Sequence, residues 1–389
     1  MLIAAALIVA VVEYLTCPVY RFDATEPFQG NVWYNPYDSL EGKIWLKGNF
    51  QIQSRAWAGI TSGRGNSNED IESLYRMLGY DIIATSDYQR INRYGEGSGL
   101  YIPVYEHGYS IPKTHQVLLG ASEVLWRDYP LFQTIHNKQD IINRLRPANR
   151  LIFLAHPLLR NGYKISDMQY LGGYDGIEVL NNYRTSTGHW DAALSAGNYV
   201  TLLSNDDAHD ISNPDEIGHH CTLIAVREKN SEEVISALKR GCAVGAKIER
   251  PHNEPWRDKA GRHKRLPVIR SVLIRDKILS IVSEPAPEKV RFIGQDGTEL
   301  GSVSGSDSVS FDLTPVRSYV RAELAWNNGI TYYLNPVCRT VDGVPAYRPV
   351  QQVDRARTNI FLLIGWATFI TILVNIIWFW RKKRMNNVE

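Results

Sequence analysis

Short apolar runs alternate with amphipathic segments through the middle of this chain, and this alternation limits the possible folds more than any other feature. The apolar runs cover residues 81–85, 151–155, 176–180 and 199–204, and the amphipathic segments cover residues 68–78, 138–145 and 231–240. Strand-like runs separated by helical segments are typical of a parallel sheet or barrel covered by helices. With 389 residues, of which 44% are hydrophobic, the chain is long enough to bury a sizeable core of this kind.

Side chains that commonly bind metals occur at the ends of strand-like runs. They are Glu106, His115, His156, Asp207 and His209. Active residues of α/β barrels come from the C-terminal ends of the strands, and a compact set of imidazoles and carboxylates there suits a divalent metal. Two simpler interpretations stay open. Glu106 and the first two histidines would bond to one another and to water, and Asp207 and His209 would belong to a turn.

Residues 360–380 form the longest apolar segment, which is interrupted by one glycine, two threonines and one asparagine. About 20 such residues span the hydrocarbon core of a bilayer as a helix. The segment ends in Trp378, Phe379 and Trp380, and a basic tail of residues 381–389 follows. Aromatic residues at the membrane interface and an excess of basic residues beyond it predict a transmembrane helix with a cytoplasmic C-terminus. A lipid bilayer is therefore an expected partner.

Residues 1–20 form a second apolar segment, which is either an uncleaved membrane anchor or a signal peptide. We favour the anchor, and either interpretation places the body of the chain outside the cytoplasm. The sequence contains four cysteines, so one disulfide is permitted in that compartment. Cys221 with Cys242 is the best pair, although small buried cysteines are equally common.

The pattern changes after residue 247. Residues 248–266 are charged, contain prolines and show no periodicity, so we interpret them as a linker. Residues 267–345 contain short strand-like runs separated by turn signals, which predict a small antiparallel sandwich. The formal net charge of +2 is spread along the chain rather than gathered into a stripe. We therefore expect no nucleic-acid partner.

Several short motifs occur in order between residues 47 and 246. They are residues 48–53 (GNFQIQ), 84–88 (ATSDY), 103–106 (PVYE), 115–120 (HQVLLG), 155–157 (AHP), 175–181 (DGIEVLN) and 205–209 (NDDAH). As a set they resemble the motifs of the PHP (polymerase and histidinol phosphatase) metal-dependent hydrolases. Residues 332–336 (YYLNP) resemble the last strand of a sandwich appended to a membrane or secreted branch of that family. The resemblance implies a distorted (β/α)7 barrel followed by a small all-β sandwich, here flanked by N- and C-terminal membrane helices.

The resemblance also implies three overlapping sets of metal ligands. The first set is a His-x-His pair with a bridging glutamate and a late aspartate, but Gln51 and Gln53 replace both histidines here, leaving Glu106 and Asp207. The second set, one glutamate and two histidines, is complete as Glu106, His115 and His156. The third set retains only His209, because Tyr88 replaces its middle histidine and residues 61–63 offer no early ligand.

These replacements predict one divalent ion (Zn, Mn or Fe) rather than three, because an amide oxygen is a weak, neutral ligand. Glu106, His115 and His156 form a three-ligand set with an open position, which is the arrangement of catalytic zinc. Asp207 or His209, if released from coordination, would act as a general base. Tyr88 would donate a hydrogen bond to a developing oxyanion, and Arg90 or Lys113 would pair with an anionic substrate group.

Two functions follow from this interpretation. The first is an extracytoplasmic, membrane-anchored metal-dependent hydrolase that acts on a small-molecule or phosphoester substrate. The second is a catalytically inactive PHP-like scaffold that binds a ligand or partner, since a fold alone does not establish chemistry. The sequence identifies no protein partner. The expected parts are an anchor or signal (1–20), a PHP-like barrel (40–247), a linker (248–266), a β-sandwich (267–345), a transmembrane helix (360–380) and a cytoplasmic tail (381–389).

Overall fold

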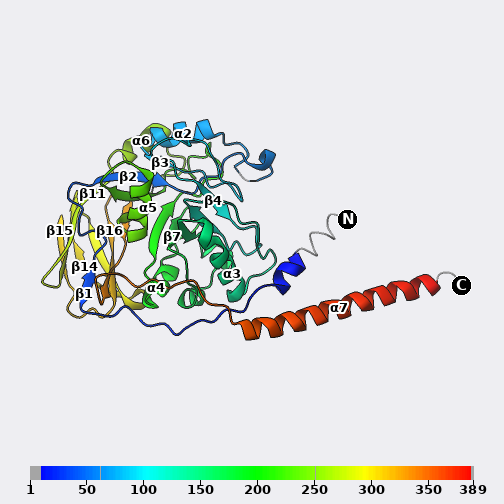
Figure 1. Cartoon of the computed structure of the whole chain (residues 1–389). Helices are drawn as coiled ribbons and strands as arrows, with labels where there is room; N and C mark the ends of the chain where they lie inside the picture. The colour runs from blue at the N-terminus through cyan, green and yellow to red at the C-terminus, as the bar shows by residue number, and fades with distance from the viewer. Residues whose placement is uncertain (1–9, 62, 250, 387–389) are drawn as a thin grey trace.

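The computed structural model describes residues 10–61, 63–249 and 251–386. Their strands form a ten-stranded, a five-stranded and a three-stranded sheet, with helices packed around them (Figure 1). The mixed α/β class predicted from the sequence is confirmed. The helices are α2 (Asn68–Met77), α3 (Ile135–Leu145), α4 (Thr187–Ser195), α5 (Ser231–Arg240), α6 (Trp256–His263) and α7 (Arg355–Asn386).

The five-stranded sheet has the order β4-β5-β6-β7-β8. Its strands are β4 (Val104–His107), β5 (Gln116–Leu119), β6 (Leu151–Leu154), β7 (Gly176–Asn181) and β8 (Thr201–Asn205). The first three strands pair antiparallel and the last three pair parallel. Every residue of these five strands is buried. Burial on both faces explains why the sequence shows continuous apolar runs here rather than alternation.

The ten-stranded sheet has the order β1-β18-β16-β17-β10-β9-β2-β3, with β13 and β14 attached through β16. Its strands are β1 (Val32–Tyr34), β2 (Ile44–Asn49), β3 (Ile82–Ile83), β9 (His220–Val226), β10 (Ala243–Ile248), β13 (Lys289–Ile293), β14 (Glu299–Ser304), β16 (Tyr319–Ala325), β17 (Ile330–Leu334) and β18 (Val337–Thr340). Because β10 pairs with β9 on one side and β17 on the other, one ladder continues from the predicted barrel segment into the predicted sandwich segment.

The hydrogen-bonded ladders of the described residues do not close into the predicted barrel. Two isolated parallel bridges, Tyr88 with Glu106 and Ile52 with Ala208, connect the five-stranded sheet to the segments that follow β3 and β2. Between β8 and β9 the connection runs through a side chain, since the backbone N–H of Ser204 donates to Oγ1 of Thr222. The barrel is therefore not confirmed, because the two-residue β3 and the antiparallel β9 leave the sheets as separate ladders.

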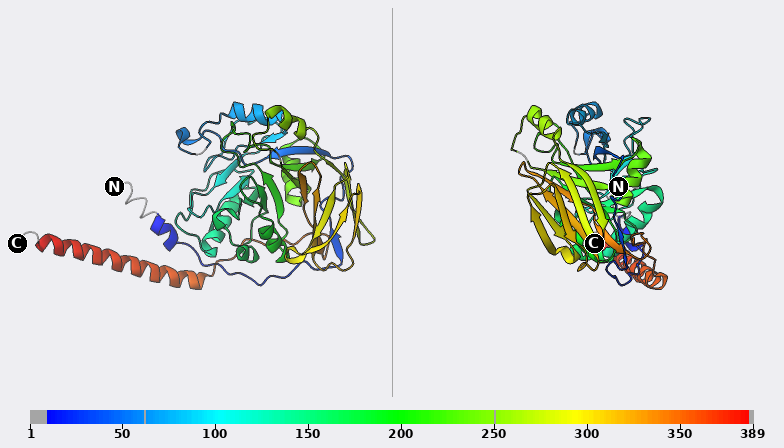
Figure 2. Two further views of the ribbon diagram at one scale, coloured as in Figure 1. Left: turned by 180° about the vertical axis from the view of Figure 1, so that it is seen from behind. Right: turned by 90° about the vertical axis from the view of Figure 1, so that its left-hand side faces the viewer.

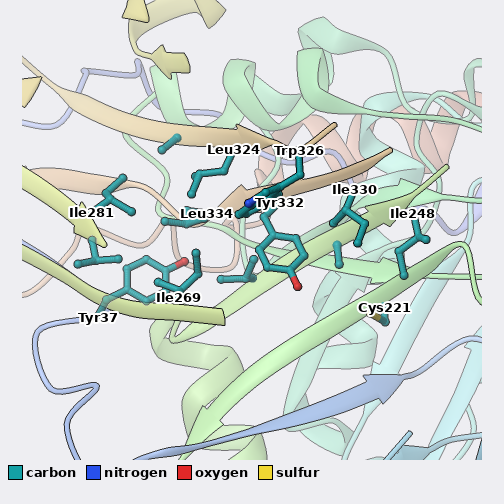
Figure 3. Close-up of a cluster of buried hydrophobic side chains, with 14 of the residues drawn as sticks. Tyr37, Cys221, Ile248, Ile269, Ile281, Leu324, Trp326, Ile330, Tyr332 and Leu334 are labelled. Carbon is teal, nitrogen blue, oxygen red and sulfur yellow. The ribbon is translucent and has the colours of Figure 1, made fainter. Parts of the chain in front are cut away.

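The three-stranded sheet contains β11 (Val268–Arg275), β12 (Ile278–Glu284) and β15 (Ser308–Asp312), all antiparallel. Its buried side chains share one hydrophobic cluster with the ten-stranded sheet, in which Ile269 and Ile281 meet Leu324, Tyr332 and Leu334 (Figure 3). Burial alternates along β12, as expected of a strand with one face on a core. This shared cluster holds the C-terminal strands together.

Two of the predicted amphipathic segments form helices that begin at a capping side chain. In α5, the side chain of Asn230 accepts a hydrogen bond from the backbone N–H of Glu233, and Gly241 ends the helix at a φ of 84°. In α2, Ser67 caps the N-terminus in the same way. The segment predicted as a linker contains α6, whose Lys259 and His263 are buried. The position of the domain boundary remains a prediction.

The predicted disulfide between Cys221 and Cys242 is wrong. All four cysteines, which lie within the described residues, are free thiols. In the antiparallel pair of β9 and β10, Cys221 lies opposite Ala246, whereas the carbonyl of Cys242 accepts a hydrogen bond from Ala225. Four positions along a strand correspond to about 13 Å, and a disulfide needs Cα atoms within about 7 Å. The register of the sheet therefore keeps these two thiols apart.

The two terminal segments lie side by side. Residues 10–15 are helical, Tyr20 forms an isolated bridge with Val353, and α7 extends away from the body on the same side as the N-terminal helix (Figures 1 and 2). Within the described residues, α7 is the helix long and apolar enough to cross a bilayer, from Arg355 to Lys383. It includes the predicted span at 360–380 and continues through the predicted tail to Asn386. Residues 1–9 and 387–389 of the predicted anchor and tail lie outside the described residues.

Candidate metal centre

Glu106, His115 and His156 converge on one buried point. One potential ligand atom from each side chain lies within 4.8 Å of the others, and none of the three residues is more than 2% exposed. Nδ1 of His115 is 2.6 Å from Oε1 of Glu106, and Nε2 of His156 is 3.4 Å from the same oxygen. The predicted convergence of these three side chains is confirmed.

The alternation of side chains along two strands places Glu106 and His115 on one face. Glu106 lies two residues after Val104 in β4, and His115 lies two residues before Val117 in β5. Both valines are buried in the same hydrophobic cluster. Since successive side chains of a strand point to opposite faces, the carboxylate and the imidazole lie on the face that carries this cluster. Antiparallel pairing puts Glu106 opposite Val117 and therefore near His115.

A backbone turn directs His156 toward Glu106. His156 follows β6 and has a φ of 28°, which is rare for a residue other than glycine. Its backbone N–H donates to Oε2 of Glu178, at 3.0 Å, and Glu178 also accepts hydrogen bonds from the amides of Asn181 and Asn205. Glu178, fixed in β7, thus holds the turn that brings the His156 ring to the site.

The two glutamines that replace the His-x-His pair are buried in the same region. Nε2 of Gln53 donates to Oε2 of Glu106 at 2.7 Å, so this carboxylate uses one oxygen for the histidines and the other for an amide. Gln51 is fully buried, and neither polar atom of its side chain has a hydrogen-bond partner among the described residues. The contact with Gln53 occupies the oxygen that a bridging glutamate would present to a second ion.

Asp207 and His209 follow β8 but are not part of the 4.8 Å group. Asp207 has a φ of 51°, and its Oδ2 accepts a hydrogen bond from Asn181 at 3.2 Å. Its Oδ1 is buried without a hydrogen-bond partner in the described part of the chain, at 3.8 Å from Nδ1 of His209. The same nitrogen lies 2.8 Å from the carbonyl oxygen of Asp207. Their roles as ligands or catalysts remain predictions.

Tyr88 contacts the site through its ring. The ring centroid lies 5.6 Å from that of His115 and 6.4 Å from that of His209. Nζ of Lys113 lies 5.8 Å from the Tyr88 centroid, whereas Arg90 is exposed. Burial, together with the charges of Glu106 and Asp207, raises the pKa of Tyr88 well above its usual range. The phenol therefore keeps its proton at neutral pH.

The charges of the buried groups are strongly interdependent. Burial alone would raise the pKa of Glu106, but the charges and hydrogen bonds of His115 and His156 lower it. Burial alone would lower the pKa of His156, but its hydrogen bond to Glu106 and the charge of Asp207 raise it to about 9. Burial lowers the pKa of His115. Burial also raises the pKa of Asp207 to about 6, although His209 opposes that rise.

The donor set fits a single divalent ion. Two ligands of one tetrahedral zinc ion lie about 3.3 Å apart, which is close to the separation of Glu106 and His156. The shorter contact between Glu106 and His115 is a hydrogen bond, which a bound ion would replace. Nε2 of His115, Nδ1 of His156 and Oδ1 of Asp207 are buried without hydrogen-bond partners among the residues described. Buried polar atoms normally have hydrogen-bond partners. These unpartnered atoms therefore indicate that the site suits an ion or another polar ligand.

We predict that metal binding releases a proton from His156. A ligating imidazole must be neutral, and His156 has a pKa of about 9 without metal. Apparent affinity should therefore rise about tenfold per pH unit from pH 7 and level off above about pH 9. Calorimetric titration with Zn²⁺ in buffers of different ionisation enthalpy measures the protons released. Affinity that stays constant between pH 7 and 9 would contradict the prediction.

Two contacts around the site were not predicted from the sequence. The sequence predicts only a lost ligand at Gln53, whereas its amide donates a hydrogen bond to Glu106. The indole N–H of Trp57 donates to the carbonyl of Tyr88 at 2.8 Å. Gln53 lies in the motif that resembles the family's first ligand pair, so its position in the sequence predicts that it is near the site. Trp57 lies outside every motif, and no local pattern identified it.

Comparison with known proteins gives little further information. No family model matches the chain, and no curated protein matches it significantly. Among solved structures it is similar to a two-domain protein from Bacteroides vulgatus ATCC 8482 that contains a predicted PHP-like metal-dependent phosphoesterase. The identity is 15% and the TM-score is 0.40, with 81% of this chain and 99% of the other covered. At these values the match assigns neither a fold nor an activity to the chain.

Proposed function

We propose that this chain is a membrane-anchored, extracytoplasmic, metal-dependent hydrolase of the phosphoesterase kind that uses one divalent ion. The observation that supports this proposal most directly is the buried group of Glu106, His115 and His156, with ligand atoms within 4.8 Å of one another. An ion held there would supply Lewis acidity toward a phosphoryl oxygen. The remaining chemistry belongs to side chains of the chain itself.

Asp207 is the best candidate for the general base. Its Oδ1 has no hydrogen-bond partner among the described residues, and its pKa of about 6 leaves it ionised at neutral pH. It would take a proton from the attacking water, with His209 beside it to stabilise the charge. Tyr88 keeps its proton and would donate to a phosphoryl oxygen as charge develops there. Gln53 would hold Glu106 in place for the metal.

The variant Asp207→Asn tests this assignment. The amide preserves the shape of the side chain but cannot accept a proton, so hydrolysis of bis(p-nitrophenyl) phosphate should fall by about 10²–10⁴-fold. Metal content, measured on the same preparation of the full-length protein, should stay at the wild-type level. Loss of the metal together with activity would identify Asp207 as a ligand instead, and full activity would exclude it from catalysis.

We also propose the membrane topology and the domain organisation. The apolar span at 360–380 within α7, followed in the same helix by basic residues at 381–384, supports a single span with a cytoplasmic C-terminus. The bridges that Ile52 and Tyr88, in the segments after β2 and β3, form with Ala208 and Glu106 support a distorted barrel. The hydrophobic cluster shared by the two C-terminal sheets supports a sandwich at 267–345.

An inactive ligand-binding scaffold is the second candidate. It is favoured by the contact of Gln53 with Glu106, because an amide now makes a hydrogen bond where the family would use a metal ligand. The two candidates differ in metal content and in hydrolysis. A purified protein that contains no metal and cleaves no phosphoester would support the scaffold.

A further inference from the structure

Six exposed apolar side chains gather on one face of the body. We call this set the apolar rim: Trp57, Tyr109, Ile111, Trp126, Leu131 and Phe132, which are 42–62% exposed. The rings of Trp57 and Trp126 are 5.7 Å apart, and the hydroxyl of Tyr109 donates to the carbonyl of Trp126. The backbone N–H of Ile111 donates to the carbonyl of Pro130, which connects Ile111 to the neighbouring Leu131 and Phe132. Single exposed apolar residues are ordinary, but a connected group marks an interaction surface.

The apolar rim surrounds the segments that carry the metal site. Tyr109 and Ile111 lie in the loop between β4 and β5, whose two ends carry Glu106 and His115. Trp57 donates to the carbonyl of Tyr88, whose ring contacts His115. Arg160, which lies four residues after His156, points its guanidinium to the carbonyl of Ile111. The apolar rim is thus joined by chain connectivity and hydrogen bonds to the segments that carry the metal centre.

The apolar rim also contacts the N-terminal helix. The ring of Tyr14 stacks on that of Phe132 with centroids 4.7 Å apart, and its hydroxyl accepts hydrogen bonds from the backbone N–H groups of Leu131 and Phe132. Arg127, adjacent to Trp126, donates to the carbonyl of Glu13. The loop that contains Leu131 and Phe132 is therefore attached to the first described turns of the chain.

The contact between the N-terminal helix and α7 fixes the position of the apolar rim along the axis of α7. A Cβ added to Gly365 would lie 2.7 Å from Cδ2 of Leu15, so the two helices pack together there. Gly365 is five residues beyond the start of the predicted span at Ile360, which is about 7–8 Å along a helix. Tyr14 and Phe132 are adjacent to this level. A span that begins at Ile360 would place Phe132 about 7–8 Å below the surface of the hydrocarbon core, within the depth of about 5–10 Å to which interfacial helices bury their apolar faces.

We propose that the apolar rim rests in the outer interface of the bilayer that α7 crosses, and that the metal centre acts on the phosphate ester of a membrane lipid headgroup. This inference rests on the proposed function. Tryptophan and tyrosine favour the level of the headgroups, and the exposed Arg55, Arg90 and Arg160 near the site provide attraction for lipid phosphate. In Figures 1 and 2, α7 leaves the body on the same side as the N-terminal helix, whose Tyr14 stacks on Phe132 of the apolar rim.

The reaction is a hydrolysis at phosphorus. Water adds to the phosphorus atom and one P–O ester bond breaks. Asp207 takes the proton of the water and passes it to the departing alkoxide, so the products are an alcohol and a phosphate with one ester bond fewer. The apolar rim contributes no reacting group. It holds the segments that carry the metal site at the level of the headgroups, where the lipid phosphates lie.

Photocrosslinking of the full-length protein tests the docking. The protein, with p-benzoylphenylalanine in place of Phe132, is placed in vesicles of phosphatidylethanolamine and phosphatidylglycerol and irradiated. We expect lipid adducts at this position, and none above background with the same probe in place of Leu300, an exposed residue of β14. Absence of lipid adducts at Phe132, or adducts to protein instead, would overturn the docking.

A pair of substrates tests the lipid specificity. In the same vesicles, Trp126→Ser combined with Phe132→Ser should lower headgroup hydrolysis by about tenfold or more, because interfacial binding scales with buried apolar area. Hydrolysis of soluble bis(p-nitrophenyl) phosphate should stay within about twofold of wild type. Ile278→Ser with Leu300→Ser, at exposed positions of β12 and β14, is the matched control and should change neither rate.

The outcomes separate this inference from the function on which it rests. Cleavage of the soluble ester without cleavage of lipid would overturn the lipid substrate and leave the hydrolase intact. Equal lipid cleavage by the wild type and the Trp126→Ser, Phe132→Ser variant would overturn the role of the apolar rim. If neither substrate is cleaved and no metal is bound, the proposed function fails and the lipid substrate with it, while the crosslink still decides whether the face docks on lipid.

Discussion

Replacing His156 with alanine should remove the metal and abolish hydrolysis. The wild-type protein is expected to hold about one equivalent of zinc, manganese or iron, and the His156→Ala variant almost none. Loss of a partner that only orients a ligand already weakens metal binding by about 10–100-fold, so loss of a ligand should cost more. Glu106 and His115 would remain as two ligands, which is fewer than the three that protein zinc sites use.

Elemental analysis of the purified full-length protein measures the metal, and cleavage of bis(p-nitrophenyl) phosphate measures activity. His136→Ala is the matched control: its ring contacts the backbone N–H of Tyr20 through Nδ1, away from the Glu106 group, so its removal should leave the metal in place. Retention of a full equivalent of metal by His156→Ala would contradict the three-ligand site. Its loss in both variants would point to general destabilisation rather than to a missing ligand.

Replacing Arg321 with methionine should be among the most destabilising single changes in the body. Arg321, in β16, is 3% exposed and makes two hydrogen bonds of 2.7 Å to the carboxylate of Asp191 in α4. It also donates to Glu323 at 2.6 Å. Removing the guanidinium leaves Asp191 as a buried carboxylate without its cation. Breaking a buried pair in this way typically costs about 3–5 kcal/mol.

Denaturant unfolding in mild detergent, followed by tryptophan fluorescence, measures this loss of stability. Arg270→Met removes the exposed pair of Arg270 with Glu284, whose side chains are 57% and 69% exposed, and should cost about 0–1 kcal/mol. Adding Asp191→Leu to Arg321→Met should recover part of the stability, because no buried charge is then left unpaired at α4. Equal losses for Arg321→Met and Arg270→Met would show that the buried network is not a major contributor.

Local sequence patterns were sufficient for the elements that depend on neighbours along the chain. The apolar runs before His156 and Asp207 became β6 and β8, and Ser231–Arg240 became α5 with its cap at Asn230. Ordered motifs were also sufficient to bring Glu106, His115 and His156 together, because each is attached to a strand of the same sheet. Strand ends and helix caps are local properties, and a single sequence contains them.

Features that depend on the pairing of strands far apart in the sequence could not be predicted from local patterns. The pairing of β10 with β17 joins Val244 to Leu334, and no local periodicity encodes that partner. The register of β9 with β10 separates Cys221 from Cys242, the pair expected from the sequence. The left-handed backbone at His156 depends on Glu178, 22 residues away along the chain. Sequence patterns therefore identified the ligands but not the contacts that hold them.

The pairing of the two ends of the body has a consequence for biosynthesis. β1 pairs with β18, and Tyr20 pairs with Val353, so these early segments acquire their partners only after more than 300 further residues have been synthesised. Contacts of such large sequence separation form slowly because the intervening loop must first close. A chain that stops short of residue 337 would keep its first strand unpaired. Completion of the body is thus linked to synthesis of the segment that leads into α7.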